Sequence, residues 1–138
     1  MAYEIPILSD SFPSTAAVIQ YRLVVLTSGG GVKPSTGLST GTAAVRPLGV
    51  AQDKTTGSGR NVPVMTFGVS KVAASTGAIK KGQYLRQTTG AASTATNLGG
   101  TVKAATAQSA FYVIGQAMTS CAAAAAGSQR FISMKFPV

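Results

Sequence analysis

The chain of 138 residues has no histidine, one cysteine and three acidic side chains, which are Glu4, Asp10 and Asp53. Because Asp53 is the only acid beyond the N-terminal segment, a carboxylate pair for acid–base catalysis would have to recruit Glu4 or Asp10 from that segment. No cluster of cysteine and histidine is available to hold zinc, and no serine lies in an S-x-x-K context. The sequence therefore predicts a protein that is not an enzyme and uses no metal or cofactor.

Other absences bear on the cellular location of the protein. Cys121 is alone, so an internal disulfide is impossible. The N-terminal residues have neither the basic region nor the long apolar stretch of a signal peptide, and no run approaches the roughly 18 apolar residues that a membrane span needs. We expect a chain that does not enter a membrane and that stays in the cytoplasm where it is made, unless it leaves as part of a particle.

The charge is strongly one-sided, with 12 Lys and Arg residues and a net charge of +9. Such a charge keeps a protein soluble, and it also attracts acidic partners such as nucleic acid or an acidic protein surface. The basic residues are scattered, whereas a nucleic-acid-binding arm usually has a dense basic run. This spread disfavours nucleic acid as the main partner. The candidate electrostatic contacts are Arg22, Lys80, Lys81 and Arg86.

What the chain does have is 16 glycines and short β-branched runs that they interrupt. This pattern is typical of an all-β sandwich or barrel. In residues 17–26 we expect Ile19, Tyr21, Leu23 and Val25 to share the core face. In residues 62–74 the hydrophobic phase changes near Gly68, which predicts a bulge or bend. The predicted strands are 17–26, 43–52, 62–74, 111–118 and 130–136, with the last closing the sheet. Residues 77–85 are predicted to form a turn and a short strand, residues 87–108 a long loop, and residues 121–126 one helical turn by propensity.

Residues 1–15 form a segment of different character, because they carry two prolines and several apolar side chains. Pro6 and Pro13 exclude a regular helix and disfavour a central strand. One interpretation is an extended arm that docks on a partner, in front of a domain at residues 16–138. The alternative is an arm folded back on its own domain. The apolar residues of the arm are Tyr3, Ile5, Ile7, Leu8 and Phe12.

The order of the short segments resembles the small capsid decoration (cement) proteins of tailed bacteriophages. The resemblance covers about residues 16–138, ending in a strand that follows an alanine-rich turn. Two departures are Gln83, where an acidic residue is expected after the glycine, and the strong positive charge. The matching pieces are AVIQYRLVVL at 17–26, PLGVAQD at 47–53, Gly59 with Val62 and Val64, FGV at 67–69, AIKKGQYL at 78–85 and VIGQAM at 113–118.

The resemblance implies a small β-barrel-like (β-tulip-like) domain with long Gly/Ser/Thr/Ala loops. It further implies a structural virion protein that binds the major capsid protein on the outside of the head, as a homotrimer, and stabilises the shell. The family has no catalytic residues to carry over. On this view the N-terminal arm contacts the capsid or a neighbouring copy, and deleting residues 2–13 should abolish binding but leave the β fold intact. Two alternatives stay open: a basic nucleic-acid-binding virion protein, and a low-copy head adaptor or fibre protein.

Overall fold

The computed structural model describes residues 2–35, 46–75, 77–88, 100–105, 113–123 and 130–137. The described residues form one nine-stranded sheet and contain no helix, which confirms the all-β prediction. The hydrogen-bonded order of the strands is β3-β2-β4-β5-β9-β8-β6-β7, with β1 paired to the other edge of β5. The strands are β1 (Ile5–Pro13), β2 (Leu23–Leu26), β3 (Val32–Pro34), β4 (Gly49–Ala51), β5 (Asn61–Ala73), β6 (Tyr84–Gln87), β7 (Val102–Ala104), β8 (Val113–Ala117) and β9 (Phe131–Phe136).

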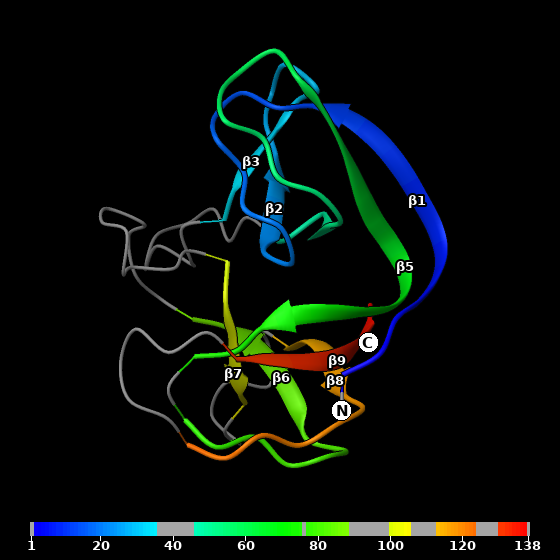
Figure 1. The fold of residues 1–138 in the computed structure, drawn as a ribbon, viewed down its shortest axis with the longest axis vertical. Helices are drawn as coiled ribbons and strands as arrows, with labels where there is room; N and C mark the ends of the chain where they lie inside the picture. The colour runs from blue at the N-terminus through cyan, green and yellow to red at the C-terminus, as the bar shows by residue number, and fades with distance from the viewer. Residues whose placement is uncertain are drawn as a thin grey trace.

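The 13-residue strand β5 organises the sheet, because it bends in the middle and takes part in both halves of the molecule (Figure 1). Its first half pairs with β4 through Val64 and Met65, and its second half pairs with β9 from Gly68 to Ala73. The φ of Gly68 is 132°, a backbone conformation that favours glycine. The bend that the sequence predicted near this residue is confirmed.

The core consists of two hydrophobic clusters, which receive consecutive residues of β2: Leu23 belongs to the larger cluster and Val24 to the smaller one. The larger cluster spans the bend, since Met65 and Val72 of β5 both belong to it. The smaller cluster fills the half made by β2, β3, β4 and the start of β5. The larger cluster contains Leu23, Val50, Met65, Val72, Ala74, Ile79, Leu85, Val102, Ile114, Ala117, Ile132, Met134 and Phe136; the smaller one contains Val18, Val24, Val32, Ala51, Val62 and Val64.

Strand β9 lies in the interior of the sheet, between β5 and β8. The segment 130–136, which was predicted to close the sheet, pairs with the second half of β5 on one side and with β8 on the other. Ile132, Met134 and Phe136 point into the core, as the alternation predicted. Ser133 is on the opposite face and is nevertheless fully buried, because the N-terminal residues cross over it.

The prediction for residues 17–26 was wrong in its first half, where the strand begins only at Leu23. Tyr21 has a φ of 61°, and this left-handed residue interrupts the extended chain. Ile19 is therefore 50% exposed instead of facing the core. From Leu23 to Val25 three consecutive side chains are buried, because this strand has a hydrophobic cluster on each face.

β4 and β8 lie within the predicted segments 43–52 and 111–118. The turn and short strand predicted at 77–85 are present, but the strand, β6, begins at Tyr84 and continues to Gln87. The long segment 87–108 contains β7, which pairs with β6. Cys121 forms an isolated bridge with Ile79, so the chain is extended where a helical turn was predicted to begin. Residues 36–45, 89–99, 106–112 and 124–129, on which parts of these predictions fall, lie outside the described residues.

Candidate interaction surface

The N-terminal segment is a strand of the sheet. β1 runs antiparallel to β5 from the pair Ile5–Val69 to the pair Pro13–Asn61 (Figure 1). Within the described residues β1 pairs with β5 alone, so it is an edge strand, a position in a sheet where proline is tolerated. Of the two interpretations of this segment, folding back on its own domain is the one observed for Ile5–Pro13.

A bulge in β1 exposes a group of large apolar side chains. Pro6 is opposite Gly68 and Leu8 is opposite Phe67, so Ile7 is an extra residue without a partner. The bulge places Leu8 on the same face as Ile5, since their partners are two residues apart on β5. We call this group the β1 surface; its exposed fractions are Tyr3 40%, Ile5 57%, Ile7 68%, Leu8 52% and Phe67 48%.

Phe12 does not belong to the β1 surface, although the sequence grouped it with the other apolar residues of the segment. It is half-buried, lies opposite Val62 in the pairing of β1 with β5, and packs against the smaller hydrophobic cluster. Phe12 therefore holds β1 to the domain. Phe67 is the residue that sequence reasoning missed. Period-two alternation predicts one shared face for Met65, Phe67 and Val69, but the pairing with β1 shifts between Phe67 and Met65, so Met65 is fully buried in the larger cluster while Phe67 is exposed.

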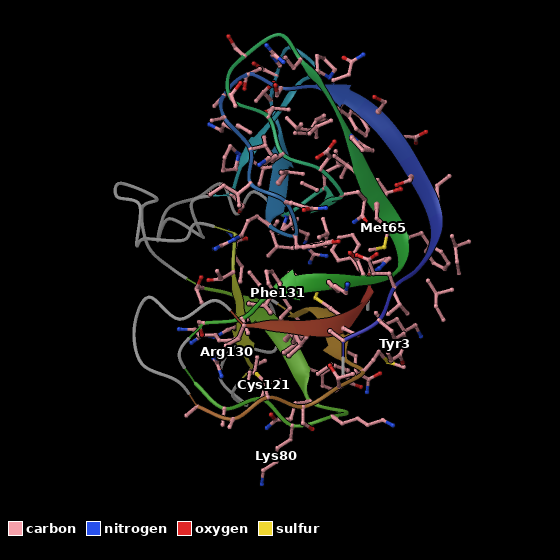
Figure 2. The ribbon with its side chains drawn as sticks, viewed as in Figure 1. Tyr3, Met65, Lys80, Cys121, Arg130 and Phe131 are labelled. Atoms are coloured by element: carbon pink, nitrogen blue, oxygen red, sulfur yellow. The ribbon has the colours of Figure 1, made fainter. Side chains whose placement is uncertain are left out.

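Tyr3 extends the β1 surface onto β9 (Figure 2). Its backbone N–H donates to the hydroxyl of Ser133, and the same hydroxyl donates to the Tyr3 carbonyl at 2.7 Å. These two bonds fix the backbone of residue 3 while leaving its side chain at the surface. The apolar group at the N-terminus is thus presented on ordered backbone.

The outer face of the sheet continues from Ile5 toward β6. Cross-strand partners share a face, and the pairings place Ile5, Val69, Lys135, Gln116 and Tyr84 in one row across β1, β5, β9, β8 and β6. Tyr84, at the far end of this row, is 54% exposed. The outer face therefore has apolar side chains at both ends and a lysine and an amide between them.

A second aromatic group lies beside β9. The rings of Tyr21 and Phe131 meet edge to face, with 5.6 Å between centroids and 75° between planes. Lys71 Nζ is 5.6 Å from the Tyr21 ring centroid, within cation–π range. Burial raises the pKa of Tyr21, and the carboxylate of Glu4 raises it further. Sequence reasoning assigned Tyr21 to the core, because alternation cannot reveal a left-handed residue.

The four basic residues chosen from the sequence do not form one patch. Arg22 is 2% exposed, so its assignment as an electrostatic contact is wrong. Lys80 and Lys81 are exposed in the turn before β6, and Figure 2 shows Lys80 projecting from one end of the molecule. Arg86 is half-buried, and its buried Nε has no hydrogen-bond partner among the residues that the structure describes. Of these four residues, only Lys80 and Lys81 are exposed enough to meet a large partner.

The acids, by contrast, gather near the β1 surface. Glu4 and Asp10 are both exposed and flank the apolar residues on the same segment, and Asp53 is the only other acidic side chain of the sequence. The β1 surface is therefore apolar with an acidic border on a protein of net charge +9. An apolar partner surface matches it better than a strongly acidic one.

The described residues offer little else that could act chemically. No three of their His, Cys, Asp and Glu side chains lie close enough together to hold a metal ion. In the part of the chain that the structure covers, we find no helix with the length and apolar character needed to span a membrane.

Comparison with known proteins gives one informative result. No family model matches the chain, and no curated protein sequence matches it either. Among solved structures, the chain is similar to the N base of the head fiber protein gp8.5 of bacteriophage phi29, with a TM-score of 0.60 and 19% sequence identity. The similarity covers 94% of each chain. At this identity the likeness shows a shared fold, and it extends over nearly the whole of both chains.

Proposed function

We propose that this protein is a structural component of a bacteriophage head, which attaches to the outside of the shell through the β1 surface. The observation that carries the proposal is the fold, shared over 94% of each chain with the base of a phage head fiber. The resemblance of the segments at 17–26, 47–53 and 78–85 to capsid decoration proteins points to the same part of a virion. A purely structural role also suits a chain with three acids and no histidine.

The proposed partner of the β1 surface is an apolar patch on the major capsid protein. Ile5, Ile7 and Leu8 each expose more than half of their side chain, and covering them would contribute about 25 cal/mol for each Å² of apolar area removed from water. The backbone beneath them is already paired with β5, so docking would require little ordering of the chain. We propose that three copies meet at a three-fold position of the shell, as decoration proteins do.

Two finer roles follow from different observations. The resemblance in sequence favours a decoration protein that covers the lattice and stabilises it, whereas the likeness in fold favours the base of a fibre. Their copy numbers differ: a lattice protein occurs at a molar ratio to the shell protein near one, and a fibre base at a few copies per particle. Quantitative mass spectrometry of purified virions distinguishes the two roles, and absence from virions would contradict both.

The role of the β1 surface is tested by measuring how tightly the purified protein binds to phage heads from which this protein is absent. Ile7→Asp adds a charge at the most exposed residue of the surface, and we expect binding to weaken at least about tenfold, which corresponds to about 1.4 kcal/mol. Ile19→Asp is the matched control, because Ile19 is 50% exposed but lies outside the β1 surface. Equal binding by both variants would show that attachment uses another face.

The basic charge leaves one alternative, a protein that binds nucleic acid in the virion. That role predicts binding to DNA with a steep linear dependence of log K on log salt concentration. Ile7→Asp would leave such binding almost unchanged, while Lys80→Ala with Lys81→Ala would weaken it. The same pair of variants therefore separates this role from attachment through the β1 surface.

A further inference from the structure

The strand pairings of the chain occur twice in the same order. The first set joins β3, β2, β4, the first half of β5 and β1, and the second set joins β7, β6, β8, β9 and the second half of β5. The register agrees as well, because Val50 pairs with both Leu23 and Met65, while Gln116 pairs with both Tyr84 and Lys135. We call these sets the first and the second repeat; they share β5.

The irregular parts of the two repeats agree in the same way. Before β2, Tyr21 has a φ of 61°, and before β6, Gly82 has a φ of 88°. The Tyr21 N–H donates to the carbonyl of Ala51 and the Gly82 N–H donates to the carbonyl of Ala117, both at 2.8 Å. The tripeptides V-K-P at 32–34 and V-K-A at 102–104 form the matching strands β3 and β7. The agreement therefore reaches the conformation of single residues.

The first repeat packs one of its faces against the core of the second. Leu23, Val50 and Met65 each lie next in sequence to a residue of the smaller cluster, so they point to the opposite face of the sheet. All three are fully buried in the larger cluster. That cluster also contains the counterparts of the whole smaller cluster: for Val18, Val24, Val32, Ala51, Val62 and Val64 these are Ile79, Leu85, Val102, Ala117, Ile132 and Met134.

The corresponding face of the second repeat lies at the surface of the chain. Tyr84, Gln116 and Lys135 occupy the three equivalent positions; Tyr84 is 54% exposed, Lys135 is exposed and Gln116 is half-buried. Through Val69 these residues continue to Ile5 of the β1 surface. We call Val69, Lys135, Gln116 and Tyr84 the outer row. The face that joins the repeats in one case is thus exposed in the other, and it is continuous with the β1 surface.

We infer that the outer row docks on the same partner as the β1 surface, and that this partner presents a carboxylate to Lys135. The inference rests on the proposed attachment to the capsid protein. Tyr84 and Ile5, at the two ends of the row, offer the large apolar contacts on which interfaces depend. A lysine covered between them needs an opposite charge, because an unpaired buried cation is costly. A second copy of this chain, with a net charge of +9 and the same lysine in its own outer row, fits less well.

The test is binding of the purified full chain to phage heads from which it is absent, using variants that unfold at the wild-type Tm. We expect Lys135→Glu to weaken binding at least about tenfold, because it brings two like charges together. Lys33→Glu is the matched control, because Lys33 is also an exposed strand lysine but lies in β3. Tyr84→Ala should weaken binding about tenfold, whereas Leu26→Ala, at a residue of β2 that is 49% exposed, should not.

A second measurement uses the wild-type protein and does not depend on how a variant folds. When the protein is bound to heads, Lys135 should be protected from acetylation, and Lys33 should react as it does in the free protein; mass spectrometry measures both.

The inference is overturned if Lys135→Glu binds as tightly as Lys33→Glu, or if Lys135 stays reactive on heads. The outer row would then be a solvent-exposed end of the sheet. Because Ile7→Asp tests the β1 surface separately, weakening by Ile7→Asp alone would leave the proposed function standing and remove this inference. Unchanged binding by both Ile7→Asp and Lys135→Glu would contradict both.

Discussion

The hydroxyl of Ser133 bridges the backbone N–H and the backbone carbonyl of Tyr3, a residue 130 positions away in the sequence. Ser133 is fully buried in β9, in the interior of the sheet. One buried side chain thus ties the N-terminal segment to β9. The placement of Tyr3 at the edge of the β1 surface depends on this bridge.

Replacing Ser133 by alanine should release the N-terminal residues. The variant loses two hydrogen bonds and leaves two backbone groups of Tyr3 without their partner, so we expect a loss of about 1–2 kcal/mol in unfolding free energy. Chemical denaturation measures the loss, and faster amide exchange at Tyr3 locates it. Ser28→Ala, at an exposed residue, should change stability by less than about 0.5 kcal/mol. Unchanged exchange at Tyr3 would contradict the bridge.

Deleting residues 2–13 should prevent the domain from folding, and not only abolish its binding to a partner. The deletion removes the whole of β1, exposes one edge of β5 and withdraws Phe12 from the smaller cluster. An unpaired strand edge invites aggregation. We expect the shortened chain to lack a cooperative thermal transition, as followed by circular dichroism. Ile7→Asp, which keeps the strand, should retain one; a normal transition in the deletion would show that β1 is dispensable.

Gly49 is a position where the sheet has no room for a side chain. A Cβ at residue 49 would lie 2.1 Å from the Met65 carbonyl oxygen, so β4 and β5 would have to separate. Gly49→Ala should cost about 3 kcal/mol or more, at the upper end of overpacking effects. Gly57→Ala is the control, because a Cβ there meets nothing within 4 Å. Similar denaturation midpoints for the two variants would refute this packing.

Tyr21 should make stability depend on alkaline pH. Its pKa is raised by burial and by Glu4, so the folded state holds the phenol proton more tightly than the unfolded state. The contribution of this tighter proton binding to folding stability is fully present below about pH 10, the ordinary pKa of tyrosine. It is lost as the pH rises through the pKa that Tyr21 has in the folded state. In Glu4→Gln the Tyr21 pKa should fall, as measured by the titration of its Cζ resonance. An unchanged titration would show that the two groups do not interact.

Much of the β architecture could be predicted because it depends on local patterns of apolar residues and glycines. The segment 62–74 alternates, contains Gly68 where its phase changes, and forms a bent strand at Asn61–Ala73. The segment 130–136 alternates and forms β9 with the predicted residues inward. The candidate surface was only partly predictable. Tyr3, Ile5, Ile7 and Leu8, which the sequence analysis grouped together, are exposed, whereas Phe12 is half-buried and Arg22 is buried.

The amino-acid sequence by itself determined an all-β chain, the bend at Gly68 and the scarcity of groups for catalysis, because these depend on residue types and on spacing along one strand. Only the tertiary structure decided that β1 folds onto β5, that β9 lies inside the sheet and that Arg22 is buried while Phe67 is exposed. The physical reason is that burial depends on which distant segment covers a face. For Ile5 the partner is Val69, and for Tyr3 it is Ser133; neither pairing leaves a local mark in the sequence.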